Sequence, residues 1–373
     1  MSTYMKTPLI ALSSLAILSA CQDSAAPPAV SQTLSVERIS ALIKPAMRKG
    51  ESADLWASDM LHDLDILKID ATAENVCAVV AVIEQESGFK ADPEVAGIRQ
   101  ILAKKISKAE ENILMSVALN TRLNQTAANG KSFRDNMTLI HTERDFESWY
   151  NEFTAAKYTA LGLKYLKKDV GDIITTAGSM QVSVDYAYEL APKIGQSSAN
   201  IRDTLYSRAG GMLYGSAHLL RYDANYSKMY YRFADYNAGH YASRNAAFQK
   251  MVANLTAAKG MGFDGDLLSY KEGSASASNT SKAIAAYAIK QKWPLTIDAL
   301  MADLKQEKDI AFTQTKTYQL IAEAHQQKFK KILTEQIPSI TLKSDKITRK
   351  LTTQWYADSV NRRYDGCLKR VGP

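Results

Sequence analysis

The chain has 373 residues, a formal net charge of +7 and three cysteines, enough material for one large domain or two modest ones. A mildly basic surface suits anionic partners such as polymers or lipid headgroups. The basic residues are scattered rather than gathered into a dense run, so an ordinary solvated surface is favoured over a nucleic-acid partner. The five histidines lack partners at ligand spacing and no glycine-rich phosphate loop occurs, so we expect no metal and no cofactor.

Residues 1–20 have the pattern of a secretory signal. Lys6 supplies a short positive region, and the apolar or small-residue stretch 9–20 is shorter than the roughly 20 residues that span a bilayer. The sequence Leu18-Ser19-Ala20-Cys21 resembles a bacterial lipobox, which implies cleavage before Cys21 and a lipid on its sulfur. Two or three acyl chains would hold the protein at a membrane, since one alone is marginal. An ordinary signal peptide with a chance cysteine is the alternative.

Residues 21–36 are predicted to form a lipidated flexible tether, because they are rich in Ala, Pro, Ser and Gln. Gln22 rather than Asp follows the cysteine, and by resemblance to sorted lipoproteins this favours the periplasmic face of the outer membrane. Loss of Lys6 with the signal lowers the net charge from +7 to +6.

We expect a helical domain over residues 37–260 and a helical extension over 261–373 that packs on it.

The rest of the chain is predicted to be mainly α, because helix-forming residues are frequent and β-branched alternation is rare. In chain order, we expect helices over residues 36–47, 52–69, 73–87, 95–119, 146–166, 184–192, 201–222, 242–257, 281–291, 297–328 and 347–370. We expect polar loops at 124–132 and 272–279 and a short extended stretch at 337–342. No segment beyond the signal is apolar enough to cross a membrane.

An apolar helix ends at the first candidate catalytic residue, Glu86. On a helix Glu86 shares its face with Val79, Val82 and Ile83, and partial desolvation by these neighbours favours a neutral carboxyl. A protonated carboxyl can donate a proton to a glycosidic oxygen. Glu84 lies about 200° around the helix, so we expect it to face solvent or a basic side chain. A surface glutamate that merely ends a buried helix is the alternative.

A second motif is Gly178-Ser179-Met180-Gln181-Val182. Its glycine permits close backbone approach, Met180 offers adaptable apolar packing, and Gln181 can both donate and accept hydrogen bonds to a sugar. An ordinary turn before a helix is the alternative.

A third motif is Tyr236-Asn237-Ala238-Gly239, just before a predicted helix. The Tyr236 hydroxyl is a candidate partner for the Glu86 carboxyl, and Asn237 is a candidate helix cap or ligand for an acetamido group. A capped helix start with a buried tyrosine is the alternative.

Together the motifs resemble those of the lytic transglycosylases with a goose-type lysozyme-like fold, in which a Glu-Ser pair, Gly-x-Met-Gln and Tyr-Asn-Ala-Gly occur in this order. The resemblance covers roughly residues 73–257. It implies a lysozyme-like α-helical catalytic core with a large helical insertion at about 95–175. It also implies that Glu86 is the catalytic acid and base. The residues it implies around the sugar are Ser87, Met180, Gln181, Tyr236 and Asn237.

The mechanism implied by this resemblance needs one carboxylate. Glu86 would protonate the bond between N-acetylmuramic acid and N-acetylglucosamine in peptidoglycan strands and then accept the proton of the muramoyl C6 hydroxyl. That hydroxyl closes on C1 and gives a 1,6-anhydro product, unlike two-carboxylate glycosidases. A hydrolytic muramidase is an alternative, with Asp185 and Asp235 as the nearest second acids. A non-catalytic wall-binding or scaffolding lipoprotein on the same fold is another.

Two features depart from the pattern of that family. Glu86 and Gly178 are 92 residues apart, whereas the family joins these motifs by a short loop, so at least two helices must fit between them. Ser179 replaces a bulky apolar residue and His240 replaces the proline after the third motif. The insertion can cover the cleft, change the preferred strand length or mark a lost activity. We expect His240 to cap or pack rather than bind substrate.

Cys77 and Cys367 remain after lipidation of Cys21. An exported chain meets an oxidising compartment, so we expect one bridge, which would join the Glu86 helix to the C-terminus and let the C-terminal helices buttress it. For a loop of about 290 residues, chain entropy gives on the order of 5 kcal/mol. A Cys77 that is simply a buried small hydrophobe is the alternative.

Nearly the whole chain also resembles a family of uncharacterised bacterial lipoproteins. Three segments carry this likeness: Arg232-Phe233-Ala234-Asp235, Ser243-Arg244-Asn245-Ala246-Ala247-Phe248-Gln249, and the final run from Arg363-Tyr364 to Cys367. The resemblance supports a lipoprotein and implies no activity.

Overall fold

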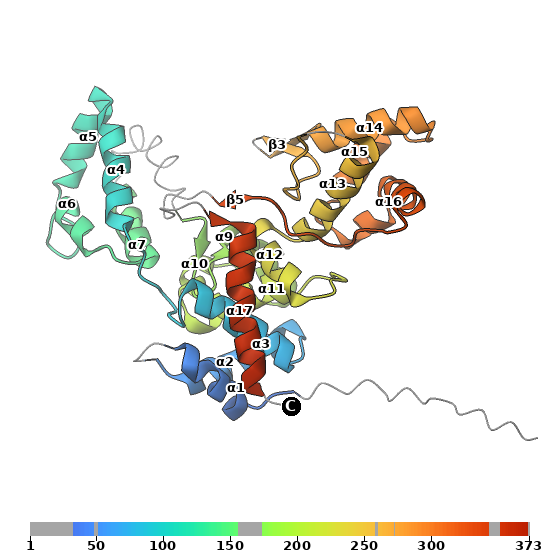
Figure 1. Ribbon diagram of the computed structural model, residues 1–373. Coiled ribbons are helices and arrows are strands. Elements are labelled where there is room, and N and C mark those ends of the chain that lie inside the picture. Colours follow the sequence, from blue (N-terminus) through green and yellow to red (C-terminus); the bar gives the residue numbers. More distant parts are fainter. Residues whose placement is uncertain are drawn as a thin grey trace, which may run out of the picture. The chain divides into compact units, whose positions relative to one another are not determined.

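The computed structural model describes residues 33–47, 51–155, 174–257, 260–271, 273–342 and 351–371. The predicted signal, the lipidation site Cys21 and most of the tether lie outside the described residues. Within these ranges the chain is mainly helical (Figure 1), which confirms the predicted fold class. The strands there form three short antiparallel pairs. None of the helices described is both long enough and apolar enough to cross a membrane.

Three helices open the described chain: α1 (Val36–Ile43), α2 (Ala53–Leu67) and α3 (Ala73–Glu86), with a 3₁₀ turn (Lys44–Ala46) after α1. Each of the three begins after a serine or threonine whose side chain accepts a backbone N–H of the first turn, the usual helix N-cap. Every residue from 76 to 83 in α3 is fully buried. This helix therefore lies inside the main hydrophobic core, as its continuous apolar run indicates.

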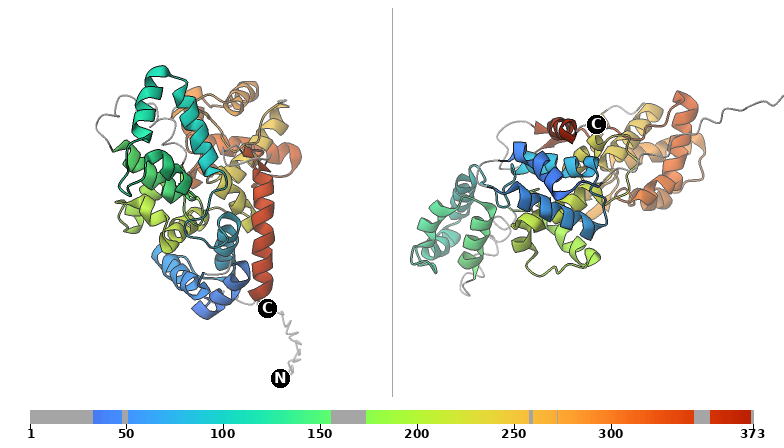
Figure 2. Two further views of the ribbon diagram at one scale, coloured as in Figure 1. Left: turned by 90° about the vertical axis from the view of Figure 1, so that its left-hand side faces the viewer. Right: turned by 90° about the horizontal axis from the view of Figure 1, so that it is seen from below.

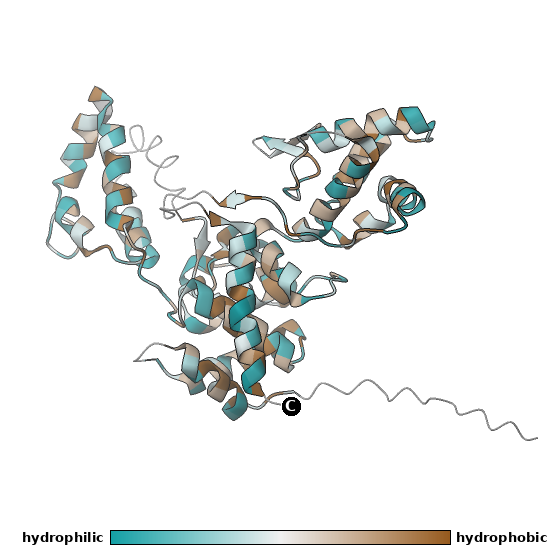
Figure 3. Ribbon diagram, viewed as in Figure 1, coloured by the Kyte–Doolittle hydropathy of each residue, from teal (hydrophilic) through white to brown (hydrophobic). Residues whose placement is uncertain are grey.

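The last helix, α17 (Thr353–Val371), packs against α3 and against α12 (Met229–Ala238), and Figures 1 and 2 both show it running alongside α3. Much of α17 is hydrophilic in Figure 3, and a single stripe of it is buried. The stripe consists of Thr353, Tyr356, Ala357, Ser359, Val360, Tyr364 and Cys367. Steps of three and four residues place these side chains on one face of a helix, which is the face turned to the core.

A disulfide joins Cys77 of α3 to Cys367 of α17, with 5.5 Å between the Cα atoms and a sequence separation of 290 residues. Both cysteines are fully buried. The predicted bridge is confirmed, and it fixes the C-terminal helix to α3.

The second motif forms the turn of a hairpin between β1 (Thr176–Ala177) and β2 (Val182–Ser183), in which Ala177 pairs with Val182. After it come α9 (Val184–Leu190), a 3₁₀ turn (Ala191–Ile194), α10 (Ile201–Leu205) and α11 (Arg208–Leu220). These elements bury a second hydrophobic cluster, and α11 also contacts α2 and α3. The single helix predicted over 201–222 is two helices, because the Ser207 side chain caps a new start.

Between the first and second motifs lies a helical unit with its own core. It comprises α4 (Ile98–Glu110), α5 (Ile113–Leu123), α6 (Phe133–Asn136), a 3₁₀ turn (Met137–Leu139) and α7 (Glu143–Thr154). Its buried residues form a separate cluster that includes Ile174 beyond a gap in the described residues. This range matches the one assigned to an insertion, although the insertion itself is defined only relative to a lysozyme-like core and stays a prediction.

Residues 242–342 form the remaining part, built from α13 (Ala242–Thr256), α14 (Asn279–Gln291), α15 (Ile297–Leu304), a 3₁₀ turn (Ile310–Gln314) and α16 (Lys316–Phe329). A hairpin of β3 (Ser269–Lys271) and β4 (Ser274–Ser276) occupies part of the predicted polar loop. β5 (Thr341–Leu342) pairs with β6 (Leu351–Thr352), so the predicted extended stretch ends in a strand. α13 to α16 share one hydrophobic cluster.

Three boundary predictions are wrong in a way that local caps explain. The helix predicted over 95–119 begins at Ile98 after Gly97, which has a φ of +79°, and it is interrupted before Ile113. The helix predicted over 297–328 is divided by caps at Asp309 and Thr315. The helix predicted from residue 146 begins at Glu143, because Thr142 forms a capping box with Asp145.

Helix α12, whose last turn carries the third motif, was not predicted from the sequence. The N-terminal flank of α12, Lys228, offers no side-chain cap, and its tyrosines have only modest helix propensity. The motif therefore ends one helix as well as preceding the next, α13.

Candidate functional site

Glu86 is the last residue of α3, and the chain turns away immediately after it. The N–H groups of Ser87 and Gly88 both donate to the Ile83 carbonyl at 3.0 Å, and the Ser87 hydroxyl donates to the same oxygen at 3.1 Å. Gly88 adopts a φ of +59°, a conformation that glycine tolerates without strain. Ser87 thus closes the helix end, and the backbone turn leaves the Glu86 side chain at the edge of the core.

The surroundings of Glu86 are apolar on one side, as predicted. Val79, Val82 and Ile83 are fully buried, whereas Glu86 is partly exposed. Glu84 points elsewhere and pairs with Arg363 of α17 at 3.5 Å, which agrees with the expectation that it faces solvent or a basic side chain.

Two buried phenols lie beside the Glu86 carboxyl. Burial raises the pKa of Tyr236 well above its usual value, and the charge of Glu86 raises it further. The same two causes, in the same order, raise the pKa of Tyr356 on α17. Both tyrosines therefore stay neutral in the physiological range and can act on Glu86 only as hydrogen-bond donors or as neutral packing.

The Tyr236 hydroxyl donates to the backbone carbonyl of Met180 at 2.7 Å. This bond ties the third motif to the second, and Glu86 is close enough to affect the pKa of the same phenol. The expected partner of this hydroxyl was the Glu86 carboxyl itself. The structure thus brings the three motifs together, with the Met180 main chain as the direct acceptor.

The second motif packs closely against its neighbours. Gly178 has a φ of +80°, and a Cβ there would collide with the carbonyl of Leu205, so only glycine fits this turn. The Met180 side chain is fully buried against Gly215 of α11, where an added Cβ would collide with it. Met180 is therefore part of the core that supports the site in this structure.

The Gln181 side chain is held by hydrogen bonds, one of them to the carbonyl of Gly178 at 3.3 Å within its own turn. Its amide nitrogen donates to Oε2 of Glu143 in α7 at 3.1 Å, and its amide oxygen accepts from the Thr176 hydroxyl at 3.2 Å. Glu143 is 1 % exposed. The helical unit between the motifs therefore reaches the proposed sugar-binding glutamine and engages it directly.

Asn237 is exposed at the end of α12, and its side-chain oxygen accepts from the Thr353 hydroxyl, at the start of α17, at 3.2 Å. His240 packs, as expected: one ring nitrogen lies 2.7 Å from the His218 carbonyl oxygen, and the ring stacks on Tyr222 with 4.2 Å between centroids. Burial lowers the pKa of His240.

The two candidate second acids are placed differently. Asp235 is fully buried and accepts from the hydroxyls of Tyr226 and Tyr222 at 2.6 and 3.1 Å and from the Ser243 N–H at 2.6 Å. Burial raises its pKa to about 6. Asp185 is exposed in the first turn of α9. Asp235 is thus committed to a structural network that joins α12 to α13.

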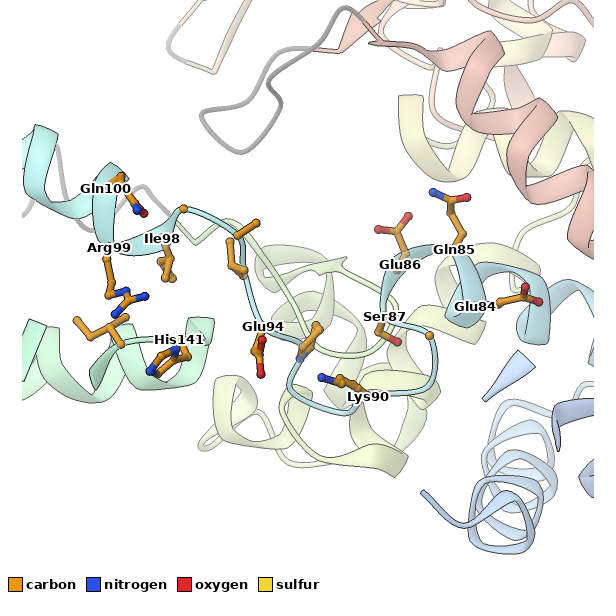
Figure 4. A pocket seen from close by; sticks show the side chains of 16 residues that line it. Glu84, Gln85, Glu86, Ser87, Lys90, Glu94, Ile98, Arg99, Gln100 and His141 are labelled. Carbon is orange, nitrogen blue, oxygen red and sulfur yellow. The ribbon is translucent and has the colours of Figure 1, made fainter. Parts of the chain in front are cut away.

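A polar cavity of about 410 Å³ opens at the end of α3 (Figure 4), within the usual range for small-molecule sites. Its walls come from the end of α3, the loop after it, the first turn of α4 and the segment before α7. The charged or ionisable residues that line it are Glu84, Glu86, Lys90, Glu94, Arg99 and His141. In Figure 4 the side chains of Gln85 and Glu86 point the same way, whereas Ser87 and Lys90 point away from them.

Side chains of α17 also contribute to this site, which the sequence did not predict. Tyr356 lies beside Glu86, the Ser359 hydroxyl donates to the Gln85 amide oxygen at 2.7 Å, and Arg363 pairs with Glu84. These three residues recur at helical spacing upstream of Cys367, which predicts a shared helix face but not what that face contacts. Only the predicted bridge indicated that this helix lies beside α3.

Among the residues that the structure describes, no group of three or more His, Cys, Asp or Glu side chains is arranged to hold a metal ion.

Comparisons with known proteins show what the chain is similar to. Residues 49–370 match the family described as "Protein of unknown function (DUF1615)". The chain is 32% identical over 370 residues to the "Uncharacterized protein YaiW" of Escherichia coli (strain K12), which covers 97% of this chain and 99% of that protein. No solved structure matches it.

Proposed function

The chain belongs to the DUF1615 family of proteins of unknown function, and we propose that it is a membrane-anchored peptidoglycan lytic transglycosylase with a lysozyme-like helical core. The observation that carries the proposal is the convergence on Glu86. The Glu86 carboxyl, at the end of a buried helix, borders a polar cavity. Its charge raises the pKa of Tyr236, and the hydroxyl of Tyr236 donates a hydrogen bond to the Met180 carbonyl in the Gly-Ser-Met-Gln turn.

In the proposed reaction, Glu86 acts first as an acid. Its proton passes to the glycosidic oxygen between N-acetylmuramic acid and N-acetylglucosamine as the bond from that oxygen to C1 breaks. Glu86, now a carboxylate, accepts the proton of the muramoyl C6 hydroxyl while the hydroxyl oxygen bonds to C1. The products are a 1,6-anhydro-muramoyl end and a free N-acetylglucosamine end, and Glu86 regains its proton. One carboxyl thus serves both steps.

The placement of Glu86 suits this double role. Its apolar helix face limits hydration on one side, and the neutral phenols of Tyr236 and Tyr356 supply no competing base.

The bridge between Cys77 and Cys367 supports an exported protein, because such bonds persist in oxidising compartments. We propose that lipidated Cys21 and the tether 21–36 place the domain at the periplasmic face of the outer membrane, within reach of the glycan strands.

A second candidate function is a non-catalytic peptidoglycan-binding or scaffolding lipoprotein on the same fold. It is favoured by the engagement of Gln181 with Glu143 and of Asn237 with Thr353, two side chains that the resemblance assigns to the sugar.

The deciding experiment digests purified peptidoglycan with the soluble form lacking residues 1–21 and reads the products by mass spectrometry. We expect anhydro-muropeptides from the wild type and from Glu84→Gln, which changes a neighbouring carboxyl that pairs with Arg363. We expect at least a thousandfold less product from Glu86→Gln, because the amide can neither give nor take the proton.

Other products point to other functions. Reducing-end muropeptides would show a hydrolase. An absence of products together with retained binding to the cell wall would favour the scaffold, and equal activity in Glu86→Gln would remove Glu86 from the mechanism.

A further inference from the structure

α17 lies antiparallel to α3, and three contacts set the register between the two helices. The disulfide joins Cys77 to Cys367 near one end. Further along, Glu84 pairs with Arg363 at 3.5 Å, and the Gln85 amide oxygen accepts from the Ser359 hydroxyl at 2.7 Å. As the residue number rises along α3, it falls along α17.

The next step in this register brings Tyr356 to Glu86. Tyr356 precedes Ser359 by three residues, which is close to one helical turn. Its side chain is 5 % exposed, and its hydroxyl is buried with no hydrogen-bond partner within bonding distance among the described residues. The Glu86 carboxyl, as a charge and as an acceptor, raises the pKa of this phenol beyond the effect of burial.

The other phenol near Glu86 is already committed. The Tyr236 hydroxyl donates its proton to the Met180 carbonyl at 2.7 Å, and a hydroxyl has only one proton to donate. Of these two tyrosines, Tyr356 is the one whose donor remains for the carboxyl.

We infer that Tyr356 of the C-terminal helix is a positioning residue for Glu86, whose hydroxyl donates a hydrogen bond to the carboxyl and holds it at the mouth of the cavity. This inference rests on the proposed function for its catalytic meaning. It places an essential part of the site outside residues 73–257, where the lysozyme-like motifs lie.

The expected effect follows from which form of the acid the bond favours. A donor that faces a carboxyl stabilises the ionised form, and hydrogen bonds to charged groups are stronger than those between neutral groups. Tyr356 would therefore keep the Glu86 carboxylate ready to accept the C6 proton, and loss of its hydroxyl would raise the pKa of Glu86.

Other ionisable groups near Glu86 also influence it. The ones that face it or share its cavity are Glu84 on α3, Tyr236 on α12, Arg363 on α17, Lys90 and Glu94 in the loop after α3, Arg99 on α4, and His141 before α7. Tyr356→Phe and Tyr364→Phe leave all of these groups unchanged.

The test compares Tyr356→Phe with Tyr364→Phe in the full mature chain in detergent. Tyr364 lies on the same helix two turns away, packs against Phe233 and feels the charge of Glu74. We expect Tyr356→Phe to lower kcat about tenfold to a hundredfold with little change in KM. We also expect it to move the upper pH limit of kcat, above which Glu86 loses the proton that it must first donate, up by roughly one unit. We expect Tyr364→Phe to keep the wild-type kcat and pH profile.

A second measurement does not depend on activity. The Glu86 carboxyl is titrated by carbon-13 NMR in glutamate-labelled protein, and its signal is identified as the one missing from Glu86→Gln. We expect Tyr356→Phe to titrate about one unit higher than the wild type. An unchanged titration overturns the inference, and so does an equal shift in Tyr364→Phe.

The two readouts separate this inference from the proposed function. If the wild type forms no anhydro products but Tyr356→Phe still shifts the titration, the contact stands and the transglycosylase proposal falls. If the wild type is active and Tyr356→Phe keeps both its kcat and its pH profile, the transglycosylase proposal stands and the positioning role falls.

Discussion

Helix α17 and the unit formed by α4–α7 both flank the end of α3 that carries Glu86, but they are attached in different ways. α17 has one buried stripe, which packs on α3 and α12 and belongs to the main core. The α4–α7 unit buries its apolar residues largely against one another, in a cluster of its own. The apolar side chains of α17 are therefore buried by the main core, whereas those of the α4–α7 unit are buried mainly by one another.

The core of the α4–α7 unit is aromatic. Phe133 packs edge-on against Phe153 and Trp149 with 5.3 and 6.4 Å between ring centroids, and the Trp149 N–H donates to the Phe133 carbonyl at 2.9 Å. The Arg122 guanidinium lies 4.1 Å from the Phe133 ring centroid. Aromatic pairs and cations over rings each stabilise a fold beyond the effect of simple burial. These contacts therefore stabilise the α4–α7 unit from within.

Polar contacts link this unit to its surroundings. Glu147 of α7 forms an ion pair with Arg202 of α10, and the Thr142 hydroxyl donates to Asp92 at 2.9 Å. Such contacts transmit less stability than shared apolar burial. We therefore expect the α3–α17 pair to unfold together with the site, and the α4–α7 unit to be able to loosen separately.

The largest test of this contrast removes the disulfide with Cys77→Ala and Cys367→Ala together. We expect the free energy of unfolding to fall by about 5 kcal/mol, because the open chain regains the entropy of a loop of nearly 300 residues. Chemical denaturation monitored by circular dichroism measures the loss. Wild-type protein treated with a reductant is the matched control and should behave like the double variant. A loss below about 1 kcal/mol would show that burial alone holds α17 in place.

The comparison also shows what the sequence can and cannot reveal. The apolar run of α3 and the turn at Gly88 were predictable, because both depend on the local sequence. The pairing of the two cysteines was predictable, because only two cysteines remain after lipidation of Cys21 and an exported chain meets an oxidising compartment. The three motifs were found in order, and the structure ties Tyr236 to Met180.

The role of α17 in the site was not predicted, for a physical reason. The meeting of Tyr356 with Glu86 depends on the register of two helices that lie far apart in sequence, and no local pattern encodes it. The engagement of Gln181 by Glu143 is of the same kind. Whether Ser87, Gln181 and Asn237 contact a sugar stays a prediction.

The next largest test concerns the α4–α7 unit and uses Phe133→Ala. Phe133 is 1 % exposed, and truncation of a buried phenylalanine typically costs about 3–5 kcal/mol. We expect α4–α7 to lose protection from hydrogen exchange, measured by mass spectrometry of peptides, while α3 and α17 keep theirs.

Leu139→Ala is the control for Phe133→Ala, since Leu139 lies in the same unit and is 47 % exposed. It should change exchange very little. Equal loss of protection in α3 and α4–α7 after Phe133→Ala would mean that the two regions form one cooperative unit, and the contrast drawn above would be wrong.

The smallest expected effect is a pH dependence of the folding stability that arises in the main core and not in the α4–α7 unit. Asp63 of α2 is 2 % exposed, and one of its carboxyl oxygens has no hydrogen-bond partner within the described residues. Burial, with a further contribution from the charge of Asp59, raises the pKa of Asp63 from 3.8 to about 8. Between these values the folded state holds a proton that the unfolded state has released, so stability falls as pH rises.

We expect the wild type to lose roughly 3 kcal/mol of stability between pH 5 and pH 8 through this group, because one pKa unit corresponds to about 1.4 kcal/mol. Asp63→Asn should lack that slope, since an amide does not ionise. Asp65→Asn, at an 80 % exposed position of the same helix, should keep it. Hydrogen exchange at the two pH values, corrected for intrinsic rates, should show the change in α2, α3 and α17 and spare α4–α7. A wild-type slope that survives in Asp63→Asn would assign the pH dependence to another group, with Asp235 as the next buried acid to test.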